Sequence, residues 1–175
     1  MQPIATLFLC VLLSACSVLP SRPAPPAVHD FGPAAAANAA AVNVDAPSWL
    51  RDERLRYRLL YNDPTQVRFY ARDHWLAPPP ALLGQRLNVA VDGDRYRLKV
   101  TLTDFEQMFD APDQARVVLN LRVHAETVAG KPVAERLFQY TQPCSSADAR
   151  GAVEAYAALV RLATDSLRTW LLEMP

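Results

Sequence analysis

Apolar and polar residues alternate with a period of two along several stretches of this chain, a spacing typical of β-strands with one buried face. The first two such stretches cover residues 55–61 and 67–75, and the turn residues Asn62, Asp63 and Pro64 between them predict a hairpin. The cleanest alternation covers residues 96–103 and 117–126. Residues 133–141 and 42–44 alternate more weakly, so the pattern predicts about five or six strands.

Two other segments have helical spacing. Pro78, Pro79 and Pro80 suit a first helical turn, whose amide hydrogens lack partners, and the stripe of Leu83, Leu87 and Val91 predicts a short helix to about Val91. A last helix follows Pro143. Ser145 and Asp148 have the spacing of a capping box, and apolar residues then recur every three or four positions, at Val153, Tyr156, Val160, Ala163, Leu167 and Trp170.

These elements predict an α+β fold in the order β-β-β-α-β-β-β-α, with an antiparallel sheet and two helices packed on one of its faces. The stripe of the last helix needs an apolar partner surface, and the sheet provides one. A coiled-coil seam is the alternative, but the stripe is under about three heptads long. The other face of the sheet carries Arg and Thr, and we expect it to contact water or a partner.

The amino-terminal residues have a different pattern. Residues 4–13 form an apolar run that is too short to cross a bilayer, which needs about 20 helical residues, and such a run predicts the apolar core of an export signal. It ends in Leu13, Ser14, Ala15 and Cys16, the lipobox pattern of bacterial lipoproteins. We therefore expect residues 1–15 to be removed as a signal peptide and Cys16 to carry covalent lipid, palmitate included. A short uncleaved anchor is the alternative.

Lipid on Cys16 predicts a location in the cell envelope, because several acyl chains anchor a protein durably. Ser17, where inner-membrane retention has Asp, resembles the default sorting to the outer membrane. Residues 16–41 are rich in Pro and Ala, which predicts an extended linker without a core. At about 3.1 Å per residue, residues 17–28 reach roughly 37 Å from the anchor. Residues 42–175 are then expected to form a single domain.

The composition of the chain disfavours several classes of function. The chain has 18 basic and 18 acidic residues, which disfavours nucleic-acid binding. Of the three cysteines, Cys10 leaves with the signal and Cys16 is lipidated, so Cys144 is expected to be a buried thiol or, alternatively, to pair between chains. No zinc-ligand spacing and no glycine-rich phosphate loop is present. We therefore expect no cofactor other than the lipid on Cys16.

A few side chains have chemistry that a site could use. Ser145 or Ser146 with His74 or His124 would suit a hydrolase, but no nucleophile elbow surrounds either serine, and helix capping explains them better. His124 is expected to be solvated. A further set of acidic residues after a predicted strand could bind a cation, although a solvated turn explains it better: Asp104, Glu106 and Asp110.

Three arginines, Arg54, Arg56 and Arg58, project from one face of a predicted strand. Guanidinium groups bind carboxylates and phosphates in a bidentate manner, so this face could hold an acidic partner or a lipid phosphate. A solvated strand edge is the alternative. Together with Trp49, these arginines are our candidate contact surface for a partner.

The order of these features resembles the PqiC-type (YmbA-like) auxiliary lipoproteins of ABC-type transport systems. The resemblance covers nearly the whole chain after the signal, and departs from the family in the uncharged start and the long alanine stretch. It rests on the lipobox at Cys16 and on the following short motifs: Asp30 to Pro33, Trp49 and Leu50, Tyr57 to Leu59, Tyr70, Trp75, Pro79 and Pro80, Leu82 and Leu83, Phe105 and Glu106, and Trp170 and Leu171.

That resemblance implies a non-catalytic lipoprotein on the periplasmic side of the outer membrane. Its implied partner is an MCE-domain protein of an intermembrane lipid transport system, and assembly into a homo-oligomer is compatible with that role. One alternative is an envelope lipoprotein that itself binds or shuttles lipid, for which a large apolar cavity would be evidence. The other is a periplasmic hydrolase, for which a serine and a histidine within hydrogen-bonding reach would be evidence.

Overall fold

The computed structural model describes residues 25–33, 42–88 and 95–174. The expected signal peptide and the lipid site at Cys16 lie outside the described residues, as do Val91 and the turn expected after it. Among the described residues, no helix is long and apolar enough to cross a membrane.

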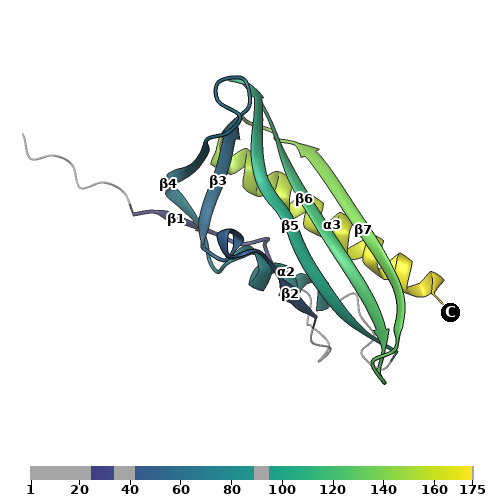
Figure 1. The fold of residues 1–175 in the computed structure, drawn as a ribbon. Coiled ribbons are helices and arrows are strands. Elements are labelled where there is room, and N and C mark those ends of the chain that lie inside the picture. Colours follow the sequence, from purple (N-terminus) through teal and green to yellow (C-terminus); the bar gives the residue numbers. More distant parts are fainter. Residues whose placement is uncertain (1–24, 34–41, 89–94, 175) are drawn as a thin grey trace, which may run out of the picture.

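The described residues form one seven-stranded sheet and two α-helices, which confirms the α+β class (Figure 1). The long helix lies across one face of the sheet (Figure 1). The elements in chain order are β1 (Ala27–His29), β2 (Asn43–Asp45), the 3₁₀-helix η2 (Ser48–Leu50), β3 (Arg54–Leu59), β4 (Val67–Trp75), α2 (Pro79–Leu87), β5 (Tyr96–Ala111), β6 (Gln114–Thr127), β7 (Pro132–Pro143) and α3 (Ala149–Glu173).

The sheet is mixed, whereas the sequence pattern predicted an antiparallel one. Strands β3 and β4 form the expected hairpin, and β5, β6 and β7 are antiparallel neighbours. In contrast, β1 is parallel to β4, and both β2 and β3 are parallel to β5. The β3–β5 pair is parallel because β4 returns the chain to the end of the sheet at which β3 begins, so β5, entered after α2, runs in the direction of β3.

Strand β5 is longer than its alternation predicted, because a β-bulge changes the phase of the pattern. Leu102 pairs with Leu121 and Asp104 pairs with Asn120, so Thr103 is an extra residue. Even-numbered residues face the core before the bulge, and odd-numbered ones, from Phe105 on, face it afterwards. The acidic residues 104, 106 and 110, expected in a turn after the strand, therefore lie within β5.

Helix α3 has the apolar stripe that the sequence predicted, and this stripe packs on β6, β7 and α2. The prediction that this stripe packs on the sheet is therefore confirmed, and the coiled-coil alternative is wrong. Its N-cap is Asp148, whose side chain accepts a hydrogen bond from the Gly151 amide at 2.8 Å. The expected capping box is wrong in this detail, because Ser145 donates instead to Glu154 at 2.6 Å. Helix α2 ends at Leu87, earlier than its stripe suggested.

Residues 27–33 belong to the folded part, although their composition predicted a linker. Strand β1 pairs with β4, and the Leu76 amide donates to the carbonyl of His29 at 2.7 Å. Phe31 is only 6% exposed, and its ring lies 5.3 Å from Trp75 and 6.2 Å from Phe105 between centroids. The linker is therefore interrupted by a short segment that completes the aromatic part of the core.

Candidate functional site

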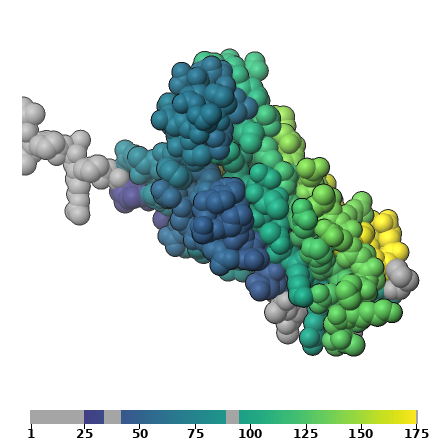
Figure 2. Space-filling model, in the orientation of Figure 1, coloured from purple at the N-terminus to yellow at the C-terminus, as the bar shows by residue number. Residues whose placement is uncertain are grey.

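The candidate site owes its position to an interruption between two strands. Strands β2 and β3 both pair with β5, at residues 99–101 and 107–109 respectively. Residues 46–56 of the chain therefore span the same stretch of sheet as residues 102–106 of β5. Because the first segment is longer, it cannot stay extended alongside β5, and it forms a loop that contains η2. Leu50, fully buried, anchors this loop, and Trp49 beside it is exposed. Figure 2 shows the loop (dark blue) against β5 on the side that faces the viewer, and in Figure 1 α3 lies behind the strands β5, β6 and β7.

A pocket of about 350 Å³ lies between this loop, β3, β4 and β5. All four residues that the sequence suggested as a contact surface line it, so the fold brings Trp49 next to the three arginines. The complete lining is Trp49, Arg54, Arg56, Arg58, Val67, Phe69, Asp104, Phe105 and Glu106. The pocket is on the far side of the sheet from α3, because Glu106 faces it while its neighbour Gln107 is buried toward the start of α3.

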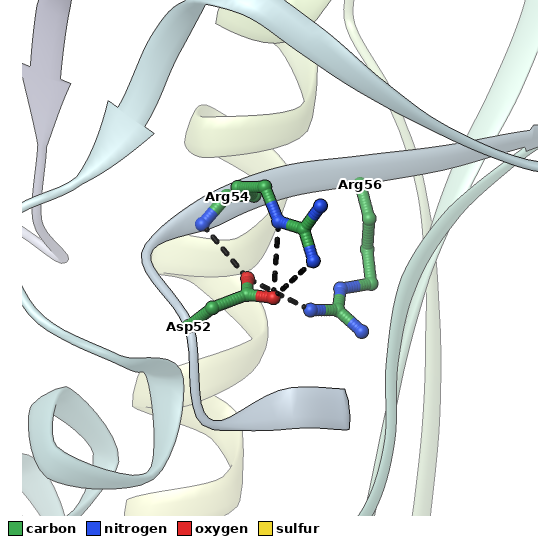
Figure 3. Close-up of polar contacts among 3 residues, drawn as sticks. All are labelled: Asp52, Arg54 and Arg56. Atoms are coloured by element: carbon green, nitrogen blue, oxygen red, sulfur yellow. Dashed lines mark hydrogen bonds and ion pairs between the residues drawn. The ribbon is translucent and has the colours of Figure 1, made fainter. Parts of the chain in front are cut away.

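Asp52 joins two of the arginines (Figure 3). Its carboxylate accepts from Arg54 Nε at 3.0 Å and Nη2 at 2.7 Å, and from Arg56 Nη2 at 3.0 Å. Partial burial by itself raises the pKa of Asp52, but the hydrogen bonds from Arg54 and the positive charges of Arg56 and Arg54 outweigh it. The pKa of this carboxyl therefore lies below its usual range, and Asp52 is ionised at neutral pH.

Arg58 has a separate partner set. Its Nε and Nη2 donate to the two carboxylate oxygens of Glu106 at 3.1 and 3.2 Å, a bidentate arrangement, and its Nη1 donates to the carbonyl of Pro64 at 2.8 Å. All three nitrogens of Arg58 are thus bonded within the protein. Arg58 holds β3, β5 and the hairpin turn together.

Aromatic rings form the outer part of the pocket. The guanidinium carbon of Arg54 lies 3.8 Å from the centre of the Phe69 ring, and that of Arg56 lies 5.6 Å from the Trp49 ring. These distances are in the range of cation–π interactions. Arg56, with a side chain only 5% exposed, is therefore not part of a solvated strand edge, which was the alternative expectation, whereas Arg54 keeps a side chain 53% exposed.

Sequence reasoning did not connect several members of this site with the arginines, among them Asp52 and Phe69, and it considered Asp104 and Glu106 only as a possible cation site. The sequence could have indicated Asp52, because Asp52, Arg54 and Arg56 are two residues apart and so project to one face of an extended segment. Phe69 and Glu106 come from β4 and β5, and no local pattern links them to the arginines.

The other candidate residues do not assemble into a site. Asp104 accepts from Asn120 at 3.0 Å, Glu106 pairs with Arg58, and Asp110 pairs with Arg116 at 2.8 Å. These three carboxylates do not form a cation site, and in the described residues no group of three or more His, Cys, Asp or Glu could hold a metal ion.

The suggested serine–histidine pairs are also not formed. Ser145 donates to Glu154, and Ser146 donates to Asp148 at 2.7 Å. His124 is half exposed and lies 3.7 Å from Glu135, as expected for a solvated histidine. Both serines therefore belong to the polar contacts around the start of α3.

Cys144 is half-buried: it packs against the hydrophobic core and also contacts a buried polar cluster. The Tyr70 hydroxyl donates to Gln107 at 2.8 Å, and Gln107 in turn donates to the Asp148 carbonyl at 3.1 Å and contacts the Cys144 sulfur at 3.7 Å. Burial raises the pKa of the Cys144 thiol, so the thiol is protonated and weakly nucleophilic at neutral pH.

We expect Asp52→Asn to lower the free energy of unfolding by about 1–2 kcal/mol at pH 7, because a charged carboxylate that accepts four hydrogen bonds is replaced by a neutral amide. The pKa of Asp52 is lowered on folding, so its stabilisation is present above the unfolded-state value near 4 and is lost as the pH falls through the folded-state value. Urea unfolding at pH 7, 5, 3.5 and 2.5 should show the difference shrinking at the acid end. Asp165→Asn, an exposed carboxylate on α3, is the control with little effect. A difference that stays constant with pH would contradict this assignment.

Comparison with known proteins relates this chain to others through its fold. No protein-family model matches the sequence, and no curated protein is similar enough to count as a relative. Solved structures do match. The crystal structure of protein XCC0632 from Xanthomonas campestris, of family DUF330, has a TM-score of 0.64 and 18% sequence identity, covering 85% of this chain and 92% of that one. The chain shares the fold of a DUF330 protein. An uncharacterised protein has a TM-score of 0.66 at 14% identity, over 85% of this chain and 99% of the other.

Proposed function

We propose that this chain is a non-catalytic lipoprotein of the cell envelope that serves as the auxiliary component of an MCE-type, ABC-linked lipid transport system. The observation that carries the proposal is the shared fold with a DUF330 protein over most of both chains. DUF330 is the family of the PqiC-type lipoproteins that the sequence motifs resemble. The fold and the motifs both favour the same family.

In this proposal, lipid on Cys16 holds the domain at the periplasmic face of the outer membrane. The described residues begin at Pro25, within the range that the composition assigned to a linker. At about 3.3–3.6 Å per residue, the intervening chain can place Pro25 no more than roughly 30 Å from Cys16. The domain would therefore work close to the membrane surface, and the partner would have to extend to it.

The pocket beside η2 is the proposed contact surface for the MCE-domain partner. Trp and Arg are the residues that most often dominate the energy of protein–protein interfaces. Here Trp49 is 52% exposed and stands beside the partly exposed Arg54. A rigid aromatic ring held on a loop by the buried Leu50 suits an anchoring contact.

Labelling with a radioactive fatty acid tests the anchor. Wild-type protein should incorporate the label and fractionate with outer membranes, whereas Cys16→Ala should incorporate none, because the acyl acceptor sulfur is gone. Cys144→Ala is the matched control and should be labelled like wild type. Equal label in the wild-type and Cys16→Ala proteins would refute the lipid attachment.

Co-purification from envelope membranes tests the partner. The wild-type protein should bring down an MCE-domain protein or a transporter subunit, with the lipids identified in the same sample. Trp49→Ala should reduce recovery at least several-fold, while Leu162→Ala, an exposed apolar residue on α3, should not. Recovery of neither component by the wild-type protein would contradict the proposal.

A further inference from the structure

Arg56 differs from its neighbours because it is buried with most of its hydrogen-bonding capacity unused. Its side chain is 5% exposed, and within the described part of the chain its hydrogen-bond partner is Asp52, reached through Nη2 alone. The Nε and Nη1 donors have no such partner, although Arg56 lines the pocket. Arg58, in contrast, uses all three of its nitrogens. Among the described residues, the buried side-chain polar atom without a partner is the Tyr140 hydroxyl, so the free Arg56 donors are not sealed in the core but are accessible from the pocket, where water or a ligand can accept from them.

The charges around the pocket balance, since three arginines face the carboxylates of Asp52, Asp104 and Glu106, but the unused donors favour an acceptor beside Arg54 and Arg56. Arg54 and Arg56 share the single carboxylate of Asp52, whereas Glu106 is bound by Arg58. Arg54 Nη1 also lacks a hydrogen bond to the described residues, and the Arg54 side chain is about half exposed. Two guanidinium groups with free donors therefore border the pocket, and a second carboxylate would complete their coordination.

The opposite wall offers an acceptor rather than a donor. Asp104 lines the pocket, and its Oδ2 accepts from Asn120 at 3.0 Å and from Thr103 at 3.2 Å. Its Oδ1 accepts no hydrogen bond from the described residues. The pocket thus combines donors at Arg54 and Arg56 with an acceptor at Asp104, a combination that a polypeptide with an acidic side chain and backbone amides can satisfy.

Exposed apolar groups surround these polar atoms. Trp49, Val67 and Phe69 all line the pocket and all remain partly exposed. The volume of about 350 Å³ is at the lower end for small-molecule sites, so it suits one or two side chains. Acyl chains fit it poorly, because charged groups from β3 and β5 occupy its walls.

We propose that this pocket recognises a segment of a partner protein that carries an acidic side chain next to a large apolar one. The carboxylate binds Arg54 and Arg56, the apolar side chain packs against Trp49 and Phe69, and a backbone amide donates to Asp104. This inference rests on the proposed function, since it assigns the chemistry of the partner that an auxiliary lipoprotein would dock.

Selection from a random dodecapeptide library displayed on phage tests the proposal, with the full lipidated chain in detergent micelles as the target. We expect enrichment of sequences in which Asp or Glu lies within two residues of an aromatic or large aliphatic residue. Synthetic versions of the selected peptides are then titrated by fluorescence polarisation. Changing the acidic residue to its amide should weaken binding about tenfold, as expected for loss of a charged hydrogen bond.

Variants of the pocket make the test specific. Trp49→Ala and Arg54→Gln should each weaken peptide binding at least tenfold, whereas their matched controls on the opposite face, Leu162→Ala and Arg150→Gln, should bind like the wild-type protein. Circular dichroism confirms that each variant folds. Absence of an acidic–apolar motif, or unchanged binding by both pocket variants, would overturn the proposal.

A titration with phospholipid tests whether a lipid phosphate, rather than an acidic side chain, occupies the pocket. Dihexanoylphosphatidylglycerol, a short-chain phospholipid, is titrated against the same variants. Lipid binding that depends on Trp49 and Arg54, without any peptide binding, would assign the pocket to a lipid phosphate and overturn the proposal. Failure here is distinguishable from failure of the proposed function, because fatty-acid labelling and co-purification of transport components do not depend on the selected peptides.

Discussion

Phe31→Ala is expected to lower the free energy of unfolding by about 3–5 kcal/mol, the range for deleting a fully packed phenylalanine side chain. The ring is almost completely buried and contacts Trp75 and Phe105, and Phe105 stacks on Tyr156 of α3 at 4.0 Å between centroids. Loss of Phe31 opens a cavity between the sheet and this aromatic cluster, which the rigid neighbouring rings can fill only in part.

The measurement is urea unfolding of the purified protein, followed by tryptophan fluorescence. Val28→Ala is the matched control, because Val28 lies in the same segment but is 59% exposed, and its replacement should change stability by under about 0.5 kcal/mol. If Phe31→Ala were as stable as Val28→Ala, the segment would be a linker after all, as its composition suggests.

Gly151→Ala is expected to destabilise the protein by about 2–3 kcal/mol, although alanine is the better helix former by about 1 kcal/mol. A Cβ at position 151 would lie only 2.1 Å from the carbonyl oxygen of Ser146 and 2.7 Å from its amide nitrogen. Both are backbone atoms, so relief requires movement of the chain that leads into α3. That movement would also disturb the hydrogen bond from the Gly151 amide to Asp148.

The same substitution in the other helix provides the control for this prediction. A Cβ at Gly84 in α2 would meet the carbonyl oxygen of Val42 at 3.3 Å, a contact that a small adjustment relieves. Gly84→Ala should therefore change the free energy of unfolding by no more than about 1 kcal/mol. Thermal and urea unfolding of both variants will show whether Gly151→Ala lowers the free energy of unfolding more than Gly84→Ala does. A Gly151→Ala protein that is more stable than wild type would contradict the packing described for the start of α3.

The candidate site illustrates which contacts a sequence can predict. Arg54, Arg56 and Arg58 were expected on one face because a strand has a period of two, and the structure places them on one face. The burial of Arg56 was not expected, because it depends on the loop that contains η2 and on strands β4 and β5. Glu106 in particular was assigned to a turn, since the bulge at Thr103 hides the continuation of β5 from any test of simple alternation.

The amino-acid sequence by itself determined where most strands and both helices occur and which of their faces is apolar, because these properties depend on residues close together in the chain. The tertiary structure alone decided the direction in which β2 and β3 pair with β5, the entry of Phe31 into the core and the meeting of Trp49 with Arg56 and Asp104. Each of these depends on contacts between residues far apart in sequence, and local periodicity carries no information about such contacts.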